Sequence, residues 1–131
     1  MSSYNNSSEI IRAWIASANA GNVDGMLALY SPNALLLPTF SPHTLRDTES
    51  RRAYFERLAS RKGFSAMLHD KTVKVQLVAP GIEVISGIYR FGLEIDDEPL
   101  VFEARFSITV NLEAKGPILH HHSSQLPRTL S

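Results

Sequence analysis

Residues 102–112 read FEARFSITVNL, and this stretch decides the fold class. Apolar and polar side chains alternate along it, which is the period of a strand with one buried side and one solvent-facing side. Similar strands are expected around it, at 73–77, 82–95 and 118–124. Turn-forming residues separate these stretches, including the acidic turn at 96–99, so the sequence predicts antiparallel hairpins.

The residues before the strands predict helices. Apolar side chains three and four positions apart predict a first helix that is capped by Ser7 or Ser8 and is stopped by Gly21 and Asn22. A short second helix is expected over 23–30, and a third is expected to be capped by Asp47 or Thr48. Three helices followed by long strands predict an α+β fold: a cone of about three N-terminal helices packed on a curved antiparallel sheet. Such a cone has one open mouth where a ligand can bind.

The third helix carries both an apolar face and a basic face. The apolar face consists of Tyr54, Phe55, Leu58 and Ala59. Five cations are expected on the opposite, solvent-exposed face: Arg51, Arg52, Arg57, Arg61 and Lys62. Because Glu49 and Glu56 lie among them, a solvated face explains these cations better than a phosphate site.

Composition limits the classes of function. The chain has 131 residues, of which 44% are hydrophobic and 20% charged, so one globular domain over 1–131 is expected. Thirteen basic residues balance thirteen acidic ones, which gives no bulk attraction to nucleic acid or to an anionic membrane. The absence of cysteine excludes disulfides, thiol catalysis and zinc sites with sulfur ligands. We see no signal peptide or membrane span, and we expect a cytoplasmic protein.

Two arginines are candidates for binding an anion. Arg90 lies inside an apolar strand, and Arg105 lies on the polar side of FEARFSITVNL, two residues after Glu103. Guanidinium groups on neighbouring strands can converge on a carboxylate, because the planar fork matches its two oxygens. The alternative is an arginine that pairs with Glu103 or Glu94, or that is exposed to solvent.

Three consecutive histidines form the next candidate group. In a strand, His120 and His122 share one face and His121 points to the other. A metal would need a third ligand such as Glu103, and a hydrogen-bonded histidine pair is the alternative. No third ligand is identified by the sequence, so we predict no metal site and no cofactor.

Acid–base chemistry has weaker candidates. The carboxylates are Asp47, Asp70 and Glu103, with Tyr54 and Tyr89 as possible hydrogen-bond donors. Each carboxylate has a structural explanation, as a helix cap, a turn residue or an arginine partner respectively. We therefore assign no catalytic residue from the sequence.

Several segments together resemble one known superfamily. They are 20–24 (AGNVD), 52–58 (RAYFERL), 88–90 (IYR), 103–106 (EARF) and 119–124 (LHHHSS). In this order they resemble the nuclear-transport-factor-2-like superfamily, also called cystatin-like or SnoaL-like. Within it, they are most similar to the association (hub) domain of calcium/calmodulin-dependent protein kinase II and its stand-alone bacterial relatives.

The resemblance implies a function as well as a fold. Hub domains oligomerise through sheet faces and helices and have a deep cavity lined by arginines, whose matching positions here are Arg90 and Arg105. The histidine pattern matches at His120 and His122. We therefore expect a stand-alone oligomerisation and small-molecule-binding domain, a homodimer or larger homo-oligomer that holds a small anionic ligand. The predicted ligand-binding residues are Arg90, Arg105, His120, His122, Glu103 and Tyr54.

Other functions stay open. Ketosteroid isomerases and SnoaL-like cyclases share the cone and carry out acid–base chemistry next to a carbonyl group, which requires an isolated acid–base group in an apolar pocket. This sequence offers cations and histidines instead. Pure scaffolding is a third possibility. No kinase domain or calmodulin-binding segment is seen, so kinase activity is not expected.

Overall fold

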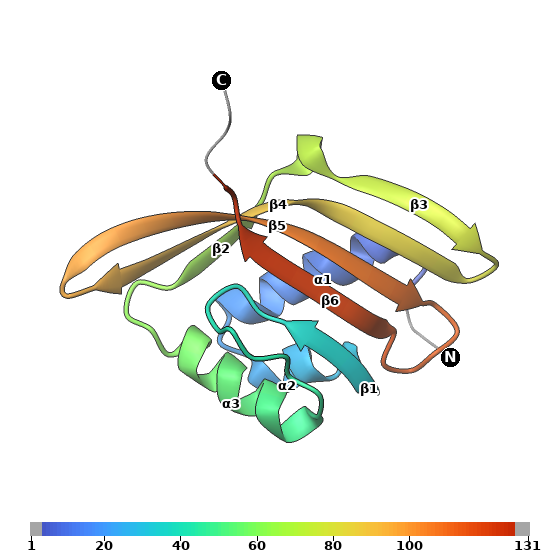
Figure 1. Ribbon diagram of the computed structural model, residues 1–131, viewed down its shortest axis with the longest axis horizontal. Helices are drawn as coiled ribbons and strands as arrows, with labels where there is room; N and C mark the ends of the chain where they lie inside the picture. Colours follow the sequence, from blue (N-terminus) through green and yellow to red (C-terminus); the bar gives the residue numbers. More distant parts are fainter. Residues whose placement is uncertain (1–3, 128–131) are drawn as a thin grey trace.

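A curved sheet covered on one face by helices makes up the molecule (Figure 1). The computed structural model describes residues 4–127. The helices are α1 (Ser7–Asn19), α2 (Val23–Leu27) and α3 (Thr48–Ala59), with a 3₁₀ turn η1 (Asp70–Thr72). The strands are β1 (Tyr30–Leu37), β2 (Ser65–Leu68), β3 (Lys74–Ala79), β4 (Ile82–Ile95), β5 (Glu98–Asn111) and β6 (Ile118–Gln125). The predicted α+β class, with three helices before the long strands, is confirmed.

The strand order shows where the sheet departs from the predicted antiparallel one. The six strands run β1-β6-β5-β4-β2, and β3 also pairs with β4. β4 and β5 form one long antiparallel hairpin, from Ile82 opposite Asn111 to Ile95 opposite Glu98. β1 pairs with β6 in parallel, so the sheet is mixed rather than wholly antiparallel. The intervening helix and strands form a connection long enough to allow this parallel pairing.

Helix ends depend on side-chain caps. The α1 cap is Asn6, whose side chain accepts a hydrogen bond from Glu9 N, and not Ser7 or Ser8 as predicted. Ser7 is instead buried, and its N and Oγ both donate to Glu83 Oε1, at 2.9 and 2.7 Å. The α3 cap is Asp47, one of the two predicted residues, with Ser50 N donating to its carboxylate at 2.8 Å. That bond lowers the pKa of Asp47.

Aromatic side chains fill the space between the helices and the inner face of the sheet, which we define as the face that the helices cover. Trp14 on α1 stacks on Tyr89 of β4, with ring centroids 5.7 Å apart, and meets Phe55 of α3 edge-on at 6.2 Å. Ile10 and Ile11 of α1 are fully buried beside them. Packed aromatic rings at these distances stabilise the core beyond the effect of area burial.

One of the cations expected on the exposed face of α3 lies in the core. Arg51 is 1% exposed, and its guanidinium donates to the carbonyl oxygens of Ala34 and Ser31, at 2.7 and 3.1 Å. It also lies 5.5 Å from the centre of the Tyr30 ring. The charge is tolerated there because carbonyl oxygens of the β1 region accept its hydrogen bonds. The expectation that Arg51 is solvent-exposed was therefore wrong.

The far end of the β4–β5 hairpin extends beyond the rest of the sheet as an arm (Figure 1). Its turn has positive φ at Asp96 and Asp97 (52° and 64°), which aspartate tolerates well. Lys62, in the segment that follows α3, contacts the arm. Its carbonyl oxygen accepts a hydrogen bond from Glu94 N at 2.9 Å, and its Nζ lies 3.6 Å from Glu94 Oε1. Among residues 4–127, no helix has both the length and the apolarity that crossing a membrane requires.

Candidate functional site

A bulge in β6 decides which histidine faces the core. Val110 of β5 pairs with Ile118, but Thr109 pairs with His120, so Leu119 is an extra residue on β6. An extra residue shifts the alternation of all residues after it by one position. As a result His121 points inward with Ile118, and His120 and His122 are exposed on the outer face, which no helix of residues 4–127 covers.

His121 is part of a buried hydrogen-bond chain. Its Nδ1 lies 2.8 Å from the Tyr30 hydroxyl and its Nε2 lies 3.1 Å from the Tyr89 hydroxyl. Trp14 Nε1 donates to the Tyr30 oxygen at 2.9 Å. We assign Tyr30 as the donor to Nδ1, which leaves the Nε2 proton to be donated to Tyr89. Burial lowers the pKa of His121 to about 3, so the ring is neutral and structural.

Five of the six predicted ligand residues lie on the outer face. Register places Arg90 opposite Glu103, and Arg105 opposite both Ile88 and Ser124. His120 and His122 follow on the neighbouring strand. Tyr54 is different: it is buried on α3, on the inner side of the sheet. The structure thus separates Tyr54 from the other five residues.

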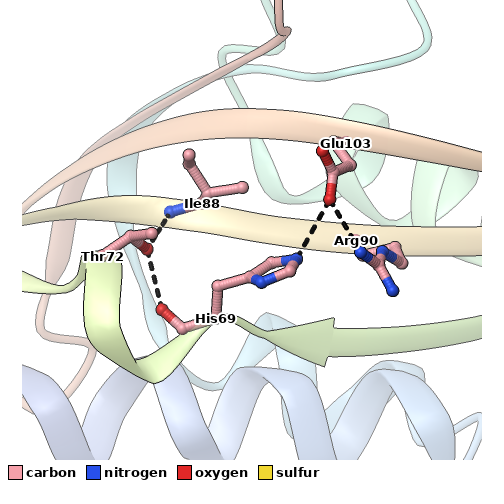
Figure 2. A network of polar contacts seen from close by, with 5 residues as sticks. All are labelled: His69, Thr72, Ile88, Arg90 and Glu103. Carbon is pink, nitrogen blue, oxygen red and sulfur yellow. Dashed lines mark hydrogen bonds and ion pairs between the residues drawn. The ribbon is translucent and has the colours of Figure 1, made fainter.

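Glu103 is the centre of a polar network on this face (Figure 2). Arg90 donates to Glu103 Oε1 at 2.9 Å, and His69 Nε2 lies 3.2 Å from the same oxygen. The hydrogen bond from Arg90 lowers the pKa of Glu103 and is the main cause of the shift. Pairing with Glu103, which the sequence analysis gave as an alternative for an arginine, is therefore what Arg90 does.

A hollow of about 460 Å³ lies beside this network. It opens where the edge of β4 changes partner from β2 to β3, and η1 fills the gap. There Thr72 Oγ1 accepts from Ile88 N at 2.8 Å and donates to the His69 carbonyl at 2.7 Å (Figure 2). A Cβ at Gly87 would lie 3.1 Å from the Phe106 ring and 3.2 Å from Thr72 Oγ1, so glycine allows both side chains to approach β4 closely. The lining residues are Thr72, Ser86, Gly87, Ile88, Arg105, Phe106, Ser107, His122 and Ser124.

The hollow has the chemistry of an anion site. Arg105 is exposed, and within residues 4–127 its side chain has no ion pair or hydrogen bond. Its nearest acidic neighbour on the strand, Glu103, is already taken by Arg90. His122 lines the same hollow together with the hydroxyls of Ser107 and Ser124. A guanidinium, an imidazole and hydroxyl donors can together hold a carboxylate.

Sequence reasoning missed several parts of this site. His69 was not among the predicted site residues, yet it lies against Glu103. The predicted site also lacked Thr72, Ser86 and Ser124, which line the hollow. Aligning the predicted strands at 102–112 and 118–124 as an antiparallel pair could have placed Ser107 and Ser124 beside Arg105 and His122. The position of Thr72 beside the hollow depends on the η1 turn, which the alternation pattern does not predict.

The described part of the chain holds no group of three or more His, Asp or Glu side chains placed to bind a metal ion. His120 and His122 share a face, but the carboxylate suggested as a third ligand, Glu103, contacts His69 and Arg90 instead.

Comparison with known proteins gives one family and several structural relatives. The sequence model of the SnoaL-like domain family matches residues 8–128. A candidate calcium/calmodulin-dependent protein kinase II association domain from Xanthomonas campestris superposes with a TM-score of 0.81 and 26% identity, covering 94% of this chain and 87% of that one. A comparison with curated protein sequences gave no significant match.

More distant structures share the fold. An uncharacterized protein with a cystatin-like fold from Caulobacter vibrioides has a TM-score of 0.75, and a candidate aromatic ring hydroxylase from Novosphingobium aromaticivorans has one of 0.78. Each is 12% identical, and each comparison covers 92% of this chain and 87% of the other. At this level of identity the likeness shows the fold alone.

Proposed function

The chain belongs to the SnoaL-like domain family, and from that premise we propose that it is a small-molecule-binding and self-association domain. The proposed ligand is a small carboxylate held on the outer face of the sheet by Arg105 and His122. Arg90 and Glu103 have an indirect role: their ion pair occupies the Glu103 carboxylate, which leaves Arg105 free to bind the ligand. His120 lies two residues before His122 on the same face.

One observation carries the binding proposal: Arg105 and His122, from different strands, line the same hollow of about 460 Å³. That volume falls within the range of about 300 to 1,000 Å³ that is usual for small-molecule sites. An unpaired guanidinium beside a row of hydroxyls favours an anion over a neutral ligand. The enzyme alternative required an isolated acid–base group between apolar walls. Glu103 is paired and His122 lies among polar groups, so the geometry favours binding.

Self-association is proposed through the outer face of the sheet. In the part of the chain that the structure describes, no helix covers this face, and it exposes several large apolar side chains, among them Met67 at 49% and Val101 at 63%. Exposed apolar residues on an open sheet face are typical of an interface between subunits. The 26% identical Xanthomonas protein is named as an association domain, which agrees with this proposal.

A carboxylate titration tests the binding part. Acetate, propanoate and succinate are added to ¹⁵N-labelled protein, and amide shifts are followed around Ser86, Ser107 and Ser124. We expect saturable shifts there. The Arg105→Gln variant should bind the carboxylate about tenfold more weakly or worse, because it lacks a charge-assisted contact. Arg46→Gln, an exposed arginine outside the hollow, is the matched control. Equal shifts in both variants would refute the proposed site.

Sedimentation analysis tests the self-association part. Wild-type protein should sediment as a dimer or larger oligomer, and Val101→Asp should raise the monomer fraction, because it places a charge within the proposed apolar interface. Leu77→Asp, on the edge strand β3, is the control for adding a charge at an exposed apolar position. A wild-type protein that stays monomeric at every concentration would contradict the proposal.

A further inference from the structure

A second hollow lies on the other side of the sheet, between α3 and the β4–β5 arm. Its volume is about 270 Å³, and it is lined by Phe40, Tyr54, Arg57, Leu58, Arg61, Leu93, Ile95 and Phe102. Two of these residues, Arg57 and Arg61, belong to the basic group that the sequence analysis regarded as a solvated helix face. The function proposed above makes no use of them.

Arg57 and Arg61 differ from their basic neighbours. Arg52 forms an ion pair with Asp24 at 2.8 Å, and Lys62 lies near Glu94. For Arg57 and Arg61, residues 4–127 supply no ion-pair or side-chain hydrogen-bond partner. Arg61 directly follows Ser60, the C-cap of α3, and its N donates to the Leu58 carbonyl at 3.2 Å; Arg57 and Arg61 both line the hollow. Two cations that line one hollow repel each other, and an anion between them removes the repulsion.

The rest of the hollow is apolar and aromatic. Phe40 and Phe102 meet edge-on with ring centroids 5.3 Å apart, and Leu93 and Ile95 of the arm complete that wall. This combination differs from the outer face, where hydroxyl groups surround the cation. Aromatic walls select a ligand with a flat apolar body, because rings pack edge-to-face or offset against one another.

Tyr54 supplies a polar group at the side of the hollow. Its hydroxyl oxygen accepts a hydrogen bond from Phe40 N at 3.2 Å. Burial raises the pKa of Tyr54 to about 12, so the hydroxyl keeps its proton at neutral pH. A protonated hydroxyl whose oxygen already accepts one bond can donate to a ligand oxygen.

We propose that this hollow binds a monocarboxylate with a single aromatic ring: the ring lies against Phe40 and Phe102, and the carboxylate is held by Arg57 and Arg61. The volume of about 270 Å³ is slightly below the usual range for drug-sized ligands, which favours one ring over several. The site is separate from the outer-face hollow, and the two share no lining residue.

Calorimetric titration with benzoate, with benzamide as a neutral isostere, tests the proposal. Wild-type protein should bind benzoate at least about tenfold more tightly than benzamide, because only benzoate carries the charge. The double variant Arg57→Gln/Arg61→Gln should lose this preference. Arg52→Gln, an exposed arginine on the same helix that points to Asp24, should keep it. Arg105→Gln should also keep it, which separates this site from the outer face.

Two results would overturn the inference. One is that benzoate and benzamide bind equally, or that neither binds the folded wild-type protein. The other is that the double variant, with its fold verified by circular dichroism, keeps the wild-type affinity for benzoate. A smaller substitution, Phe102→Leu, gives an independent check: it should weaken benzoate binding while leaving binding of acetate at the outer face unchanged.

Discussion

The two faces of β6 place chemically identical side chains in opposite environments. His121 is 1% exposed and has a tyrosine hydroxyl at each ring nitrogen, whereas its neighbour His122 is exposed and lines an open polar hollow. Burial holds His121 neutral, and the same residue type one position along the chain stays free to meet a ligand. The comparison teaches that the position of a side chain relative to the helices, and not its identity, decides whether it serves the fold or the site. Four predictions test this contrast.

The strongest test removes each histidine in turn. His121→Ala leaves a cavity and deprives two buried tyrosine hydroxyls of a partner, so the free energy of unfolding should fall by about 3 to 5 kcal/mol. His122→Ala should change it by less than about 0.5 kcal/mol, because the side chain is exposed. Urea unfolding followed by fluorescence measures both values. Similar losses in the two variants would show that the faces do not differ as described.

The same contrast can be sharpened on α3, where Arg51 is buried and Arg52 is exposed. Arg51→Met preserves much of the volume but removes the donors to two carbonyl oxygens, and it should cost about 2 to 3 kcal/mol of unfolding free energy. Arg52→Met loses only the surface pair with Asp24, a cost of at most about 1 kcal/mol. Thermal and urea unfolding measure both, and an equal cost would place Arg51 outside the core.

The pH dependence of stability follows from His121. Its pKa is about 3 in the folded state and lies near 6.5 in the unfolded state, so the unfolded chain takes up the proton first as the pH falls. The stabilisation is complete above about pH 6.5 and is lost as the pH falls towards about 3; from about pH 7 to about pH 5 the loss should be about 2 kcal/mol.

Matched variants isolate this contribution. His122→Gln should keep the wild-type pH dependence, and His121→Gln should flatten it between about pH 7 and about pH 5. That window lies above the range in which carboxylates such as Asp47 and Glu103, whose pKa values are lowered, begin to titrate. A wild-type stability that does not change across the window would contradict a neutral, buried His121.

The smallest effect is expected on the outer face. Glu103→Gln breaks the ion pair with Arg90, but both side chains are about 40% exposed, so the loss should be under about 1 kcal/mol. Arg90→Gln should give a similar value, and urea unfolding measures both. A loss as large as that of His121→Ala would mean that this network stabilises the fold as strongly as the core does.

The sequence predicted the strands better than the faces. The alternation in 102–112 is the alternation of β5, and the helices begin close to the predicted residues. Counting by twos from buried Ile118 would place His120 and His122 inside, and only the bulge at Leu119 turns His121 inward. A bulge depends on the register with the neighbouring strand, which a single strand's pattern does not contain.

Arg51 was missed for another reason. Counted along the helix, it precedes Tyr54, Phe55 and Leu58 at the spacing of the buried stripe, so the period placed it on the apolar face while its charge argued for solvent. The charge was given more weight, yet carbonyl oxygens near β1 accept its hydrogen bonds. Those acceptors come from a distant part of the chain, and sequence spacing gives no access to them.

The parallel pairing of β1 with β6 has a consequence for the order in which the protein folds. β1 precedes β6 in the chain, so this edge of the sheet cannot close until β6 has been synthesised. Contacts between residues so far apart in sequence slow folding, because the intervening chain must be ordered before they form. During synthesis, the apolar residues of β1 therefore lack their partner strand until β6 is available. Exposed apolar surface and an unpaired strand edge promote aggregation in this interval, and a chaperone that covers them would prevent it.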